Sequence, residues 1–345
     1  MSVRPDEPVA IIGAGSWGTA LAAVLGRAGI PVRLWGRRKE LVARLSQQRA
    51  NEQYLPGITL PDSVQPCEEL GQAIAQAATI VLVVPAVGMR EQSRRLARLL
   101  NSSPLIISAA KGLEENTGLR MAQVIAQEIP SAAESVVAMS GPNLAIEVAR
   151  GIATTTVVAC PDLALARRAQ ALFMQPSFRV YTNADIIGVE MGGALKNIVA
   201  IAAGAIDGLG FGDNTKAALV TRGLAEIRRL GVAMGACAET FGGLSGMGDM
   251  VATCASRHSR NHYVGFMLAQ GKTLDQILAP MDQIAEGVPT TRAALALAER
   301  AGVEMPIAQA VHSVLFEGMP AKTAVAGLMT RAGKDELDEP WLGAR

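Results

Sequence analysis

The sequence has few of the residues that mark disulfide-rich, metal-binding or nucleic-acid-binding proteins. Its 345 residues include only four cysteines, and no two of these form a C-x-x-C pair. Cysteines scattered in this way argue against a disulfide framework or a zinc site and favour a reducing compartment. Neither sign of charge is in excess, because 32 lysines and arginines face 31 aspartates and glutamates. Binding to nucleic acid or to a membrane surface is therefore not expected. The four cysteines are Cys67, Cys160, Cys237 and Cys254.

Long hydrophobic runs are also missing. The run Ile80–Val84 ends at Pro85 and is far too short to cross a bilayer, and the first eight residues do not have the shape of a signal peptide. We therefore expect a cytoplasmic protein without membrane insertion. Hydrophobic residues make up 50% of the chain and charged residues 18%, a balance typical of a packed globular protein, and the length favours two domains.

The first half of the chain alternates between short apolar runs and helical patterns, beginning with a strand at Val9–Ile12 and a helix from Ser16 to Ala28. Strands that are apolar almost throughout are typical of a mainly parallel sheet covered on both faces, and right-handed crossovers make such a domain doubly wound. The further predicted strands are Val32–Trp35, Thr79–Val84, Leu105–Ser108, Val136–Ser140 and Thr154–Ala159.

Strand signals nearly disappear after Asp185, where helical patterns continue alone. We therefore predict an α/β fold with a doubly wound domain at residues 1–185, an all-helical domain at 186–335 and a loose tail at 336–345. The predicted helices of the second half are Ile186 to Gly204, Thr215 to Gly231, Tyr263 to Gln270, Leu274 to Leu278, Thr290 to Arg300 and Pro306 to Phe316.

A glycine-rich turn, G-x-G-x-x-G, follows the first strand and opens the first helix. In such a turn Gly13 allows the sharp bend, Gly15 lets the backbone approach a pyrophosphate, and Gly18 lets helix and strand pack closely. The unpaired N–H groups of the helix then face the phosphate. This context predicts a Rossmann-type dinucleotide-binding domain. The alternative is a glycine-rich turn in an ordinary α/β domain.

The end of the second strand indicates which dinucleotide binds. NAD-binding domains usually place Asp or Glu there to hold the ribose 2′-hydroxyl. Here Trp35 is followed by Gly36, Arg37 and Arg38, without a carboxylate. Arginine binds phosphate through forked, charge-assisted hydrogen bonds, so we expect NADP(H) to be preferred, with NAD(H) as the second choice. The alternative is that Arg38 only begins the next helix.

Two polar patches follow strands of the first half. Lys111 lies just past Leu105–Ser108, and Gly141 and Asn143 lie just past Val136–Ser140. Because ligands of open α/β sheets bind beyond the carboxyl ends of the strands, both patches should line the crevice near the nicotinamide.

Lys196 lies within a strongly apolar helix of small residues. Burial disfavours the charge of a lysine, so such a residue is costly unless it is paired or functional. The same burial lowers the pKa of its amine, which makes Lys196 a usable general base near neutral pH. The alternative is a lysine whose amine reaches solvent from a buried helix.

A second polar segment of the helical half runs from Gly246 to Asn261. Asp249 follows a glycine turn and could orient a lysine ammonium, while Arg260 and Asn261 supply donors suited to a phosphate or carboxylate. The structural alternatives are a helix cap for Asp249 and a surface cation for Arg260. No spacing of His, Cys and carboxylates indicates a metal site.

In combination, these segments resemble the bacterial NAD(P)-dependent glycerol-3-phosphate dehydrogenases. The resemblance implies a Rossmann-type domain followed by a helical domain like the C-terminal domain of 6-phosphogluconate dehydrogenases. It also implies the interconversion of sn-glycerol 3-phosphate and dihydroxyacetone phosphate, which supplies glycerol 3-phosphate for phospholipid synthesis. The matching segments are Ile12–Leu21, Lys111–Glu114, Ser140–Pro142, Gly192–Asn197, Thr221–Glu226, Gly246–Asp249, Ser259–Asn261 and Val303–Pro306.

The resemblance implies roles for individual residues as well. Lys196 would accept the proton when the alcohol is oxidised, with Lys111 and Asp249 beside it as catalytic groups. Asn143 stands where many relatives carry Ser or Thr, and it can still donate a hydrogen bond. The residues expected to contact the glycerol phosphate are Lys111, Gly141, Asn143, Lys196, Asp249, Ser259, Arg260 and Asn261. Those expected to contact the dinucleotide are Ser16, Trp17, Arg37, Lys111, Ala145, Arg260, Ile284 and Glu286.

Other readings of the sequence stay open at this point. A β-hydroxyacid dehydrogenase or a ketopantoate reductase would also suit the pair Lys196 and Asn197, although Ser259–Asn261 and Lys111–Leu113 favour the glycerol phosphate chemistry. A non-catalytic NADPH sensor would need neither a buried Lys196 nor Asp249. The small apolar residues of the second half suit a homodimer interface and a tight core equally well.

Overall fold

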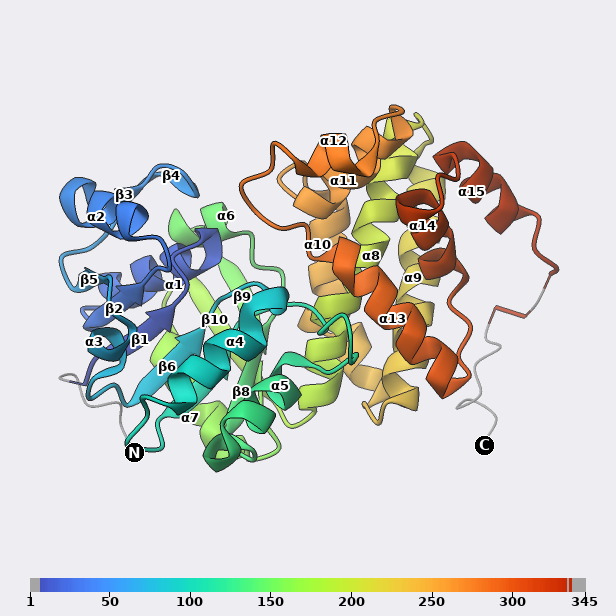
Figure 1. Cartoon of the computed structure of the whole chain (residues 1–345). Helices are drawn as coiled ribbons and strands as arrows, with labels where there is room; N and C mark the ends of the chain where they lie inside the picture. The colour runs from blue at the N-terminus through green and yellow to red at the C-terminus, as the bar shows by residue number, and fades with distance from the viewer. Residues whose placement is uncertain (1–6, 334, 337–345) are drawn as a thin grey trace.

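A computed structural model describes residues 7–333, 335 and 336 of the chain. Figure 1 shows two parts side by side, a sheet flanked by helices in the N-terminal half and a group of helices in the C-terminal half. The last strand, β10, ends at Asn183, and the long helix α8 begins at Ile186. The predicted tail lies outside the described residues except for Glu336, whose carbonyl oxygen accepts a hydrogen bond from Arg222.

The N-terminal half is built on an eight-stranded sheet with the order β10-β9-β8-β7-β6-β1-β2-β5. The strands from β5 to β8 in this order are parallel, whereas β9 runs antiparallel to β8, and β10 is parallel to β9. The strands are β1 (Val9–Ile12), β2 (Val32–Trp35), β5 (Val64–Cys67), β6 (Thr79–Leu82), β7 (Leu105–Ser108), β8 (Val136–Ser140), β9 (Thr154–Ala159) and β10 (Phe178–Asn183), with β3 (Ala50–Asn51) and β4 (Leu55–Thr59) in a separate hairpin.

Helices cover both faces of this sheet, which explains why its central strands are apolar throughout. Along β1, Val9 and Ile11 pack into one hydrophobic cluster with α1 and α7, while Ala10 and Ile12 pack into another with α3, α4 and α5. Successive side chains of a strand point to opposite faces, so both sets are buried. The helices are α1 (Ser16–Arg27), α2 (Lys39–Gln48), α3 (Leu70–Ile74), α4 (Ala86–Ala97), α5 (Met121–Glu128), α6 (Ala145–Ala149) and α7 (Leu163–Phe173).

The strand order reverses at β1, which lies between β2 and β6. The connection after β1 runs to one side of the sheet, and later connections run to the other side, which leaves a crevice beyond the carboxyl ends of the strands. Doubly wound sheets bind their ligands in this crevice. The glycine turn that follows β1 therefore lies at the expected ligand site of the sheet.

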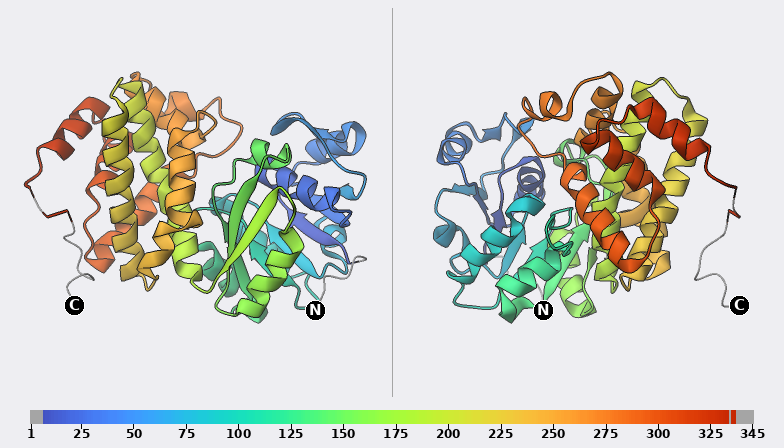
Figure 2. Two further views of the ribbon diagram at one scale, coloured as in Figure 1. Left: turned by 180° about the vertical axis from the view of Figure 1, so that it is seen from behind. Right: turned by 45° about the vertical axis from the view of Figure 1, so that its right-hand side comes forward.

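The C-terminal half is arranged around α8 (Ile186–Gly208), which contacts α9, α10, α11, α13 and α14 (Figure 2). Among the described helices α8 is the one long and apolar enough to cross a membrane, but 83% of its apolar stretch is buried inside the structure. Its small residues belong to a tight core, since Ala194, Ala200 and Ala203 are fully buried. The other helices are α9 (Asp213–Ala233), α10 (Asp249–Ala255), α11 (Arg260–Ala269), α12 (Leu274–Leu278), α13 (Gly287–Ala301), α14 (Pro306–Phe316) and α15 (Ala321–Met329).

The structure confirms the predicted fold class and differs in its weaker elements. The strands β5 and β10, the β3–β4 hairpin and the helices α3, α6, α10 and α15 were not expected from the sequence. β5 is an edge strand that contains Pro66, and proline weakens any strand pattern. α11 begins at Arg260 instead of Tyr263 because the side chain of Ser259 caps it.

Candidate active site

The glycine turn after β1 has the geometry that a pyrophosphate needs. Gly13 has φ +125°, and a Cβ atom there would lie 2.5 Å from the carbonyl oxygen of Val83. At Gly15, the N-cap of α1, a Cβ would meet nothing within 4 Å, and no side chain caps the helix. The turn therefore offers open space in front of unpaired backbone N–H groups, and these residues fit a dinucleotide.

The two residues after the turn contact other parts of the protein. Ser16 Oγ donates a hydrogen bond to Gln283 Oε1 over 3.0 Å, so the loop before α13 reaches across to the turn. Trp17 packs edge-on against Phe178, and its buried indole Nε1 has no hydrogen-bond partner among the described residues. Ala145, also expected at the cofactor, is the first residue of α6 and lies half-buried.

The two arginines after β2 are both exposed. Arg38 is the N-cap residue of α2, yet its side chain makes no capping hydrogen bond. Its guanidinium lies 5.3 Å from the centre of the Tyr54 ring and donates to Gln53 Oε1. Neutral partners leave its positive charge uncompensated, which suits a phosphate better than a ribose hydroxyl.

The predicted catalytic residues form one connected cluster. Lys196 is only 5% exposed, so the alternative of an amine in solvent is wrong. Its Nζ donates to Asp249 Oδ1 over 2.7 Å, and Lys111 Nζ donates to Asp249 Oδ2 over 2.7 Å and to the carbonyl oxygen of Gly141 over 2.9 Å. One buried carboxylate from α10 thus joins the lysine of α8 to the lysine that follows β7. Asp249 does not cap a helix with its side chain, which was the structural alternative.

Burial and, to a smaller extent, the nearby Lys111 cation lower the pKa of Lys196, while Asp249 raises it, and the net result is a pKa of about 8. An amine with this pKa exists in both protonation states near neutral pH. It can therefore donate a proton in one direction of a reaction and accept one in the other.

The sequence did not point to Thr253, which belongs to the same cluster. Its Oγ1 accepts a hydrogen bond from Lys196 Nζ and lies 3.2 Å from Asp249 Oδ1. Residues 249 and 253 are four apart on α10 and so share one helix face. This spacing was the only sign in the sequence that Thr253 lies beside Asp249. That Thr253 also contacts Lys196 is visible only in the structure.

The start of α11 lies next to this cluster. Asn261 Nδ2 donates to Oδ1 of Asn197, the residue after Lys196, and Asn261 Oδ1 accepts from the backbone N–H of Gly287. Arg260 is exposed and donates to the carbonyl oxygen of Ile284 over 2.6 Å. The amide of Asn261 thus has structural partners that the sequence did not reveal, and one of its amide hydrogens already has an acceptor.

Asn143 is likewise engaged within the fold. Its Nδ2 donates to the carbonyl oxygen of Thr155, and its Oδ1 accepts from the hydroxyl of Thr156, both over distances of 2.8–2.9 Å. Both contacts tie the segment after β8 to β9. A substrate contact by this side chain would use its second amide hydrogen or the second lone pair of Oδ1.

Glu286 joins the helical half to the start of α4. Its Oε1 accepts from the backbone N–H of Ala86 over 3.2 Å, while its buried Oε2 has no partner among the described residues. Burial raises the pKa of this carboxyl to about 7. Its neighbour Ile284 exposes 38% of its surface.

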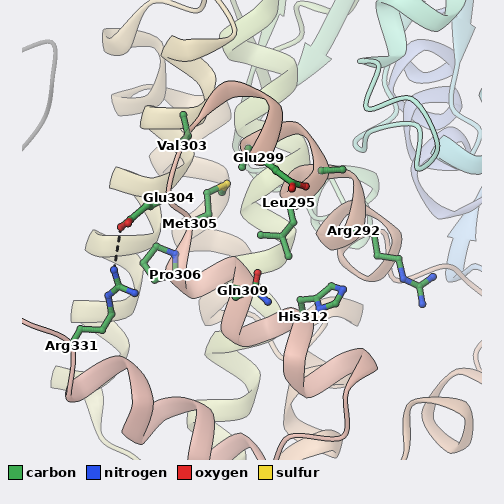
Figure 3. A pocket seen from close by; sticks show the side chains of 12 residues that line it. Arg292, Leu295, Glu299, Val303, Glu304, Met305, Pro306, Gln309, His312 and Arg331 are labelled. Atoms are coloured by element: carbon green, nitrogen blue, oxygen red, sulfur yellow. Dashed lines mark hydrogen bonds and ion pairs between the residues drawn. The ribbon is translucent and has the colours of Figure 1, made fainter.

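A cavity of about 690 Å³ lies elsewhere, between α13 and α14 (Figure 3). Arg331 and Glu304 form an ion pair at its edge. None of the predicted site residues lines this cavity, so it is separate from the candidate active site.

Fold and site together define a class of protein. The sheet has a dinucleotide-binding turn at its switch point, and the helical half has a buried lysine of lowered pKa. This combination is typical of a nicotinamide-dependent dehydrogenase with a helical second domain.

Comparison with known proteins identifies the family. Residues 8–166 match the model for the N-terminus of NAD-dependent glycerol-3-phosphate dehydrogenase, and residues 185–326 match the model for its C-terminus. The chain belongs to the NAD-dependent glycerol-3-phosphate dehydrogenase family.

Individual relatives are similar over nearly their whole length. A protein of Geobacillus kaustophilus named glycerol-3-phosphate dehydrogenase (NAD(P)+) is 49% identical over 334 residues, which covers 96% of this chain and 97% of the relative. The corresponding protein of Pelotomaculum thermopropionicum is 48% identical over 337 residues, with 97% of each chain covered.

Two solved structures show how much more similar the chain is to this family than to a ketopantoate reductase. The crystal structure of glycerol-3-phosphate dehydrogenase from Coxiella burnetii is 36% identical and superposes with a TM-score of 0.91 over 95% of this chain and all of that chain. A ketopantoate reductase from Ralstonia eutropha is only 16% identical, with a TM-score of 0.57 over 92% of this chain and 99% of that chain. The second likeness shows a shared fold alone.

Proposed function

We propose that this chain interconverts dihydroxyacetone phosphate and sn-glycerol 3-phosphate with NAD(P)(H), and so supplies glycerol 3-phosphate for phospholipid synthesis. The observation that carries the proposal is the cluster of Lys196, Asp249 and Lys111 in a member of this family. The cluster provides one group that exchanges a proton near neutral pH and a second cation beside it.

Each residue of the cluster has a distinct part in this proposal. The glycine turn Gly13–Gly18 would hold the nicotinamide cofactor, which would supply or accept the hydride at C2 of the substrate. Protonated Lys196 donates its proton to the ketone oxygen during reduction, and neutral Lys196 takes the hydroxyl proton during oxidation. Lys111 donates a hydrogen bond that polarises the same oxygen. Asp249 accepts hydrogen bonds from both amines and thereby holds them in place.

The start of α11 is proposed to hold the phosphate of the substrate. Arg260 supplies a guanidinium, and Ser259 and Asn261 lie on either side of it at the N-terminus of the helix. Helix N-termini and arginine favour phosphate groups. Gly141 and Asn143, at the end of β8, are proposed to contact the glycerol part from the other side.

NADP(H) is the proposed preferred cofactor, with NAD(H) as the second choice. Support comes from Arg37 and Arg38, which are exposed at the end of β2 where NAD-binding domains usually carry an acidic residue. We further propose a cytoplasmic enzyme whose cofactor domain comprises residues 1–185 and whose catalytic domain comprises residues 186–335.

The test is the disappearance of NADPH absorbance with dihydroxyacetone phosphate, run in parallel with ketopantoate. We expect rapid oxidation with the first substrate and none above background with the second. Oxidation with ketopantoate alone would overturn the proposed substrate. Equal rates with NADH and NADPH would overturn only the cofactor preference.

A further inference from the structure

We infer that Glu190 and Arg120 form a positioning pair, which sets the catalytic helix α8 against the loop that carries Lys111. The inference rests on the proposed function, because it assigns this pair a part in the same reaction. Neither residue belongs to the cluster around Lys196, and neither is expected to touch substrate or cofactor.

The pair connects the two halves of the molecule. Glu190 lies in the second turn of α8 and is 9% exposed. Its Oε1 accepts from the backbone N–H of Ala122 over 2.8 Å, and its Oε2 accepts from the guanidinium of Arg120. Arg120 is the N-cap residue of α5. A carboxylate from the helical half therefore accepts hydrogen bonds at the N-terminus of a helix in the sheet domain.

The contact lies at one end of the segment that carries Lys111. This segment, residues 109–120, leaves the sheet at the end of β7 and ends at Arg120, where α5 begins. Lys111 near its start is bound to Asp249, and Arg120 at its end is bound to Glu190. The segment is thus fixed to the helical half at both ends.

The same helix carries the other catalytic lysine. Lys196 follows Glu190 by six residues on α8, or about 9 Å along the axis at about 1.5 Å per residue. Between them, α8 passes so close to β8 that a Cβ on Gly193 would lie 2.4 Å from Ser140 Oγ. A helix packed this closely transmits a shift at Glu190 to Lys196.

One further ion pair between the Lys111 segment and the helical half is much more exposed than Arg120–Glu190. Arg292 and Glu115 form an ion pair whose side chains are 52% and 39% exposed, against 14% and 6% for Arg120 and Glu190. A buried ion pair is a poor way to gain stability, since apolar residues of similar size often stabilise as well. It does impose one geometry, because both charges lose their partners if the helix moves.

The test compares Glu190→Gln with Glu226→Gln in the full-length protein. Glu226 is also buried on the helical half, but it contacts the backbone of α14 and not the sheet domain. We expect Glu190→Gln to lower kcat with dihydroxyacetone phosphate by about 10–100-fold, because small misplacements of reacting groups cost about 100-fold. NADPH affinity should stay unchanged, and the control should keep the parent kcat. An unchanged kcat in Glu190→Gln would overturn the inference.

A double variant separates positioning from stability. Combining Glu190→Gln with Arg120→Met removes the unpaired cation, so the melting temperature should recover toward that of the parent protein. If the pair acts by positioning, kcat stays low in the double variant, and the pH at which its kcat changes differs from that of the parent protein. Recovery of kcat together with the melting temperature would overturn the inference.

If Glu190→Gln folds poorly, Arg120→Lys provides a second test. It keeps the positive charge but replaces the forked guanidinium with a single ammonium group. We expect it to lower kcat without changing NADPH affinity, and an unchanged kcat would count against the pair. The parent enzyme tests the proposed function separately. A parent without activity on dihydroxyacetone phosphate would overturn that function, whereas an active parent with equally active variants would overturn only the role of the pair.

Discussion

Lys196 shows how a single residue obtains its chemistry from its surroundings. An exposed lysine is protonated well above neutral pH, but burial in α8 brings the pKa of this amine to about 8. Asp249 keeps the pKa from falling further and at the same time fixes the position of the amine. The balance between these effects gives a group whose pKa suits the proposed proton exchange in both directions of the reaction.

This pKa predicts opposite pH profiles for the two directions. Oxidation of sn-glycerol 3-phosphate needs the neutral amine, so its kcat should rise as the pH passes about 8. Reduction of dihydroxyacetone phosphate needs the protonated amine, so its kcat should fall over the same range. Measuring both from about pH 6 to about pH 10 checks this, since each limb reports the essential group in the complex. Two profiles that rise together would contradict the assignment of Lys196.

At the scale of residues, the sequence revealed charges in unusual places but not their partners. Lys196 was recognisable because a lysine within an apolar helix needs a reason, and Lys111 because it follows a strand of a parallel sheet. Thr253 and Glu190 were not recognisable, because Lys196 lies 57 residues from Thr253 and Ala122 lies 68 residues from Glu190 in the chain. The sequence also did not reveal the structural partners of the Asn143 and Asn261 side-chain amides.

Elements were predictable in proportion to how completely they are buried. β1, β2, β7, β8 and β9 begin and end where the sequence predicted, because strands covered on both faces are mostly apolar or β-branched. β10 alternates between buried and exposed residues at the edge of the sheet, and it lacks the continuous run that marked the others. The antiparallel placement of β9 depends on the path of the chain and has no local signature.

The end of β2 carries a prediction about the cofactor. Arg38→Ala should raise the KM for NADPH by about 10–100-fold, since a hydrogen bond to a charged group contributes about 1.5–3 kcal/mol and each 1.4 kcal/mol is about tenfold. The KM for NADH should change little. Arg98→Ala, which removes an exposed arginine at the end of α4, controls for the loss of charge. Equal effects on both cofactors would contradict a contact with the 2′-phosphate.

The N-terminus of α14 carries a prediction about stability. Glu226 accepts hydrogen bonds from the backbone N–H groups of Ile307 and Ala308, and burial raises the pKa of its carboxyl from 4.5 to about 7. The folded protein therefore holds a proton that the unfolded chain releases. The stability that this bound proton contributes to the folded protein is fully present below pH 4.5, the pKa of the carboxyl in the unfolded chain. It is lost as the pH rises through about 7.

Replacing this carboxyl should flatten that dependence. In Glu226→Gln, the free energy of unfolding from urea titrations should fall less between about pH 5 and about pH 8 than in the parent protein. Glu226→Ala should lose about 1–3 kcal/mol for each N–H group left without an acceptor. A parent and a glutamine variant with identical pH dependence would contradict the raised pKa of Glu226.

At the scale of the whole molecule, the proposed active site depends on how the two halves meet. In the proposal, the sheet domain contributes the glycine turn and Lys111, and the helical half contributes Lys196, Asp249 and Glu286. Contacts between the halves occur at Ser16, Ala86 and Arg120 as well as at Asp249. The sequence indicated two domains, but the pairing of charges between them required the structure.

The central claim is that Lys196 is the proton-exchanging group of a glycerol-3-phosphate dehydrogenase. The most direct test is the kcat of Lys196→Ala with dihydroxyacetone phosphate and NADPH, measured beside NADPH binding by fluorescence. We predict that the parent turns over rapidly, while the variant loses about 100–10,000-fold in kcat, the typical contribution of a positioned acid or base, and still binds NADPH. Turnover of the variant close to that of the parent would contradict the account.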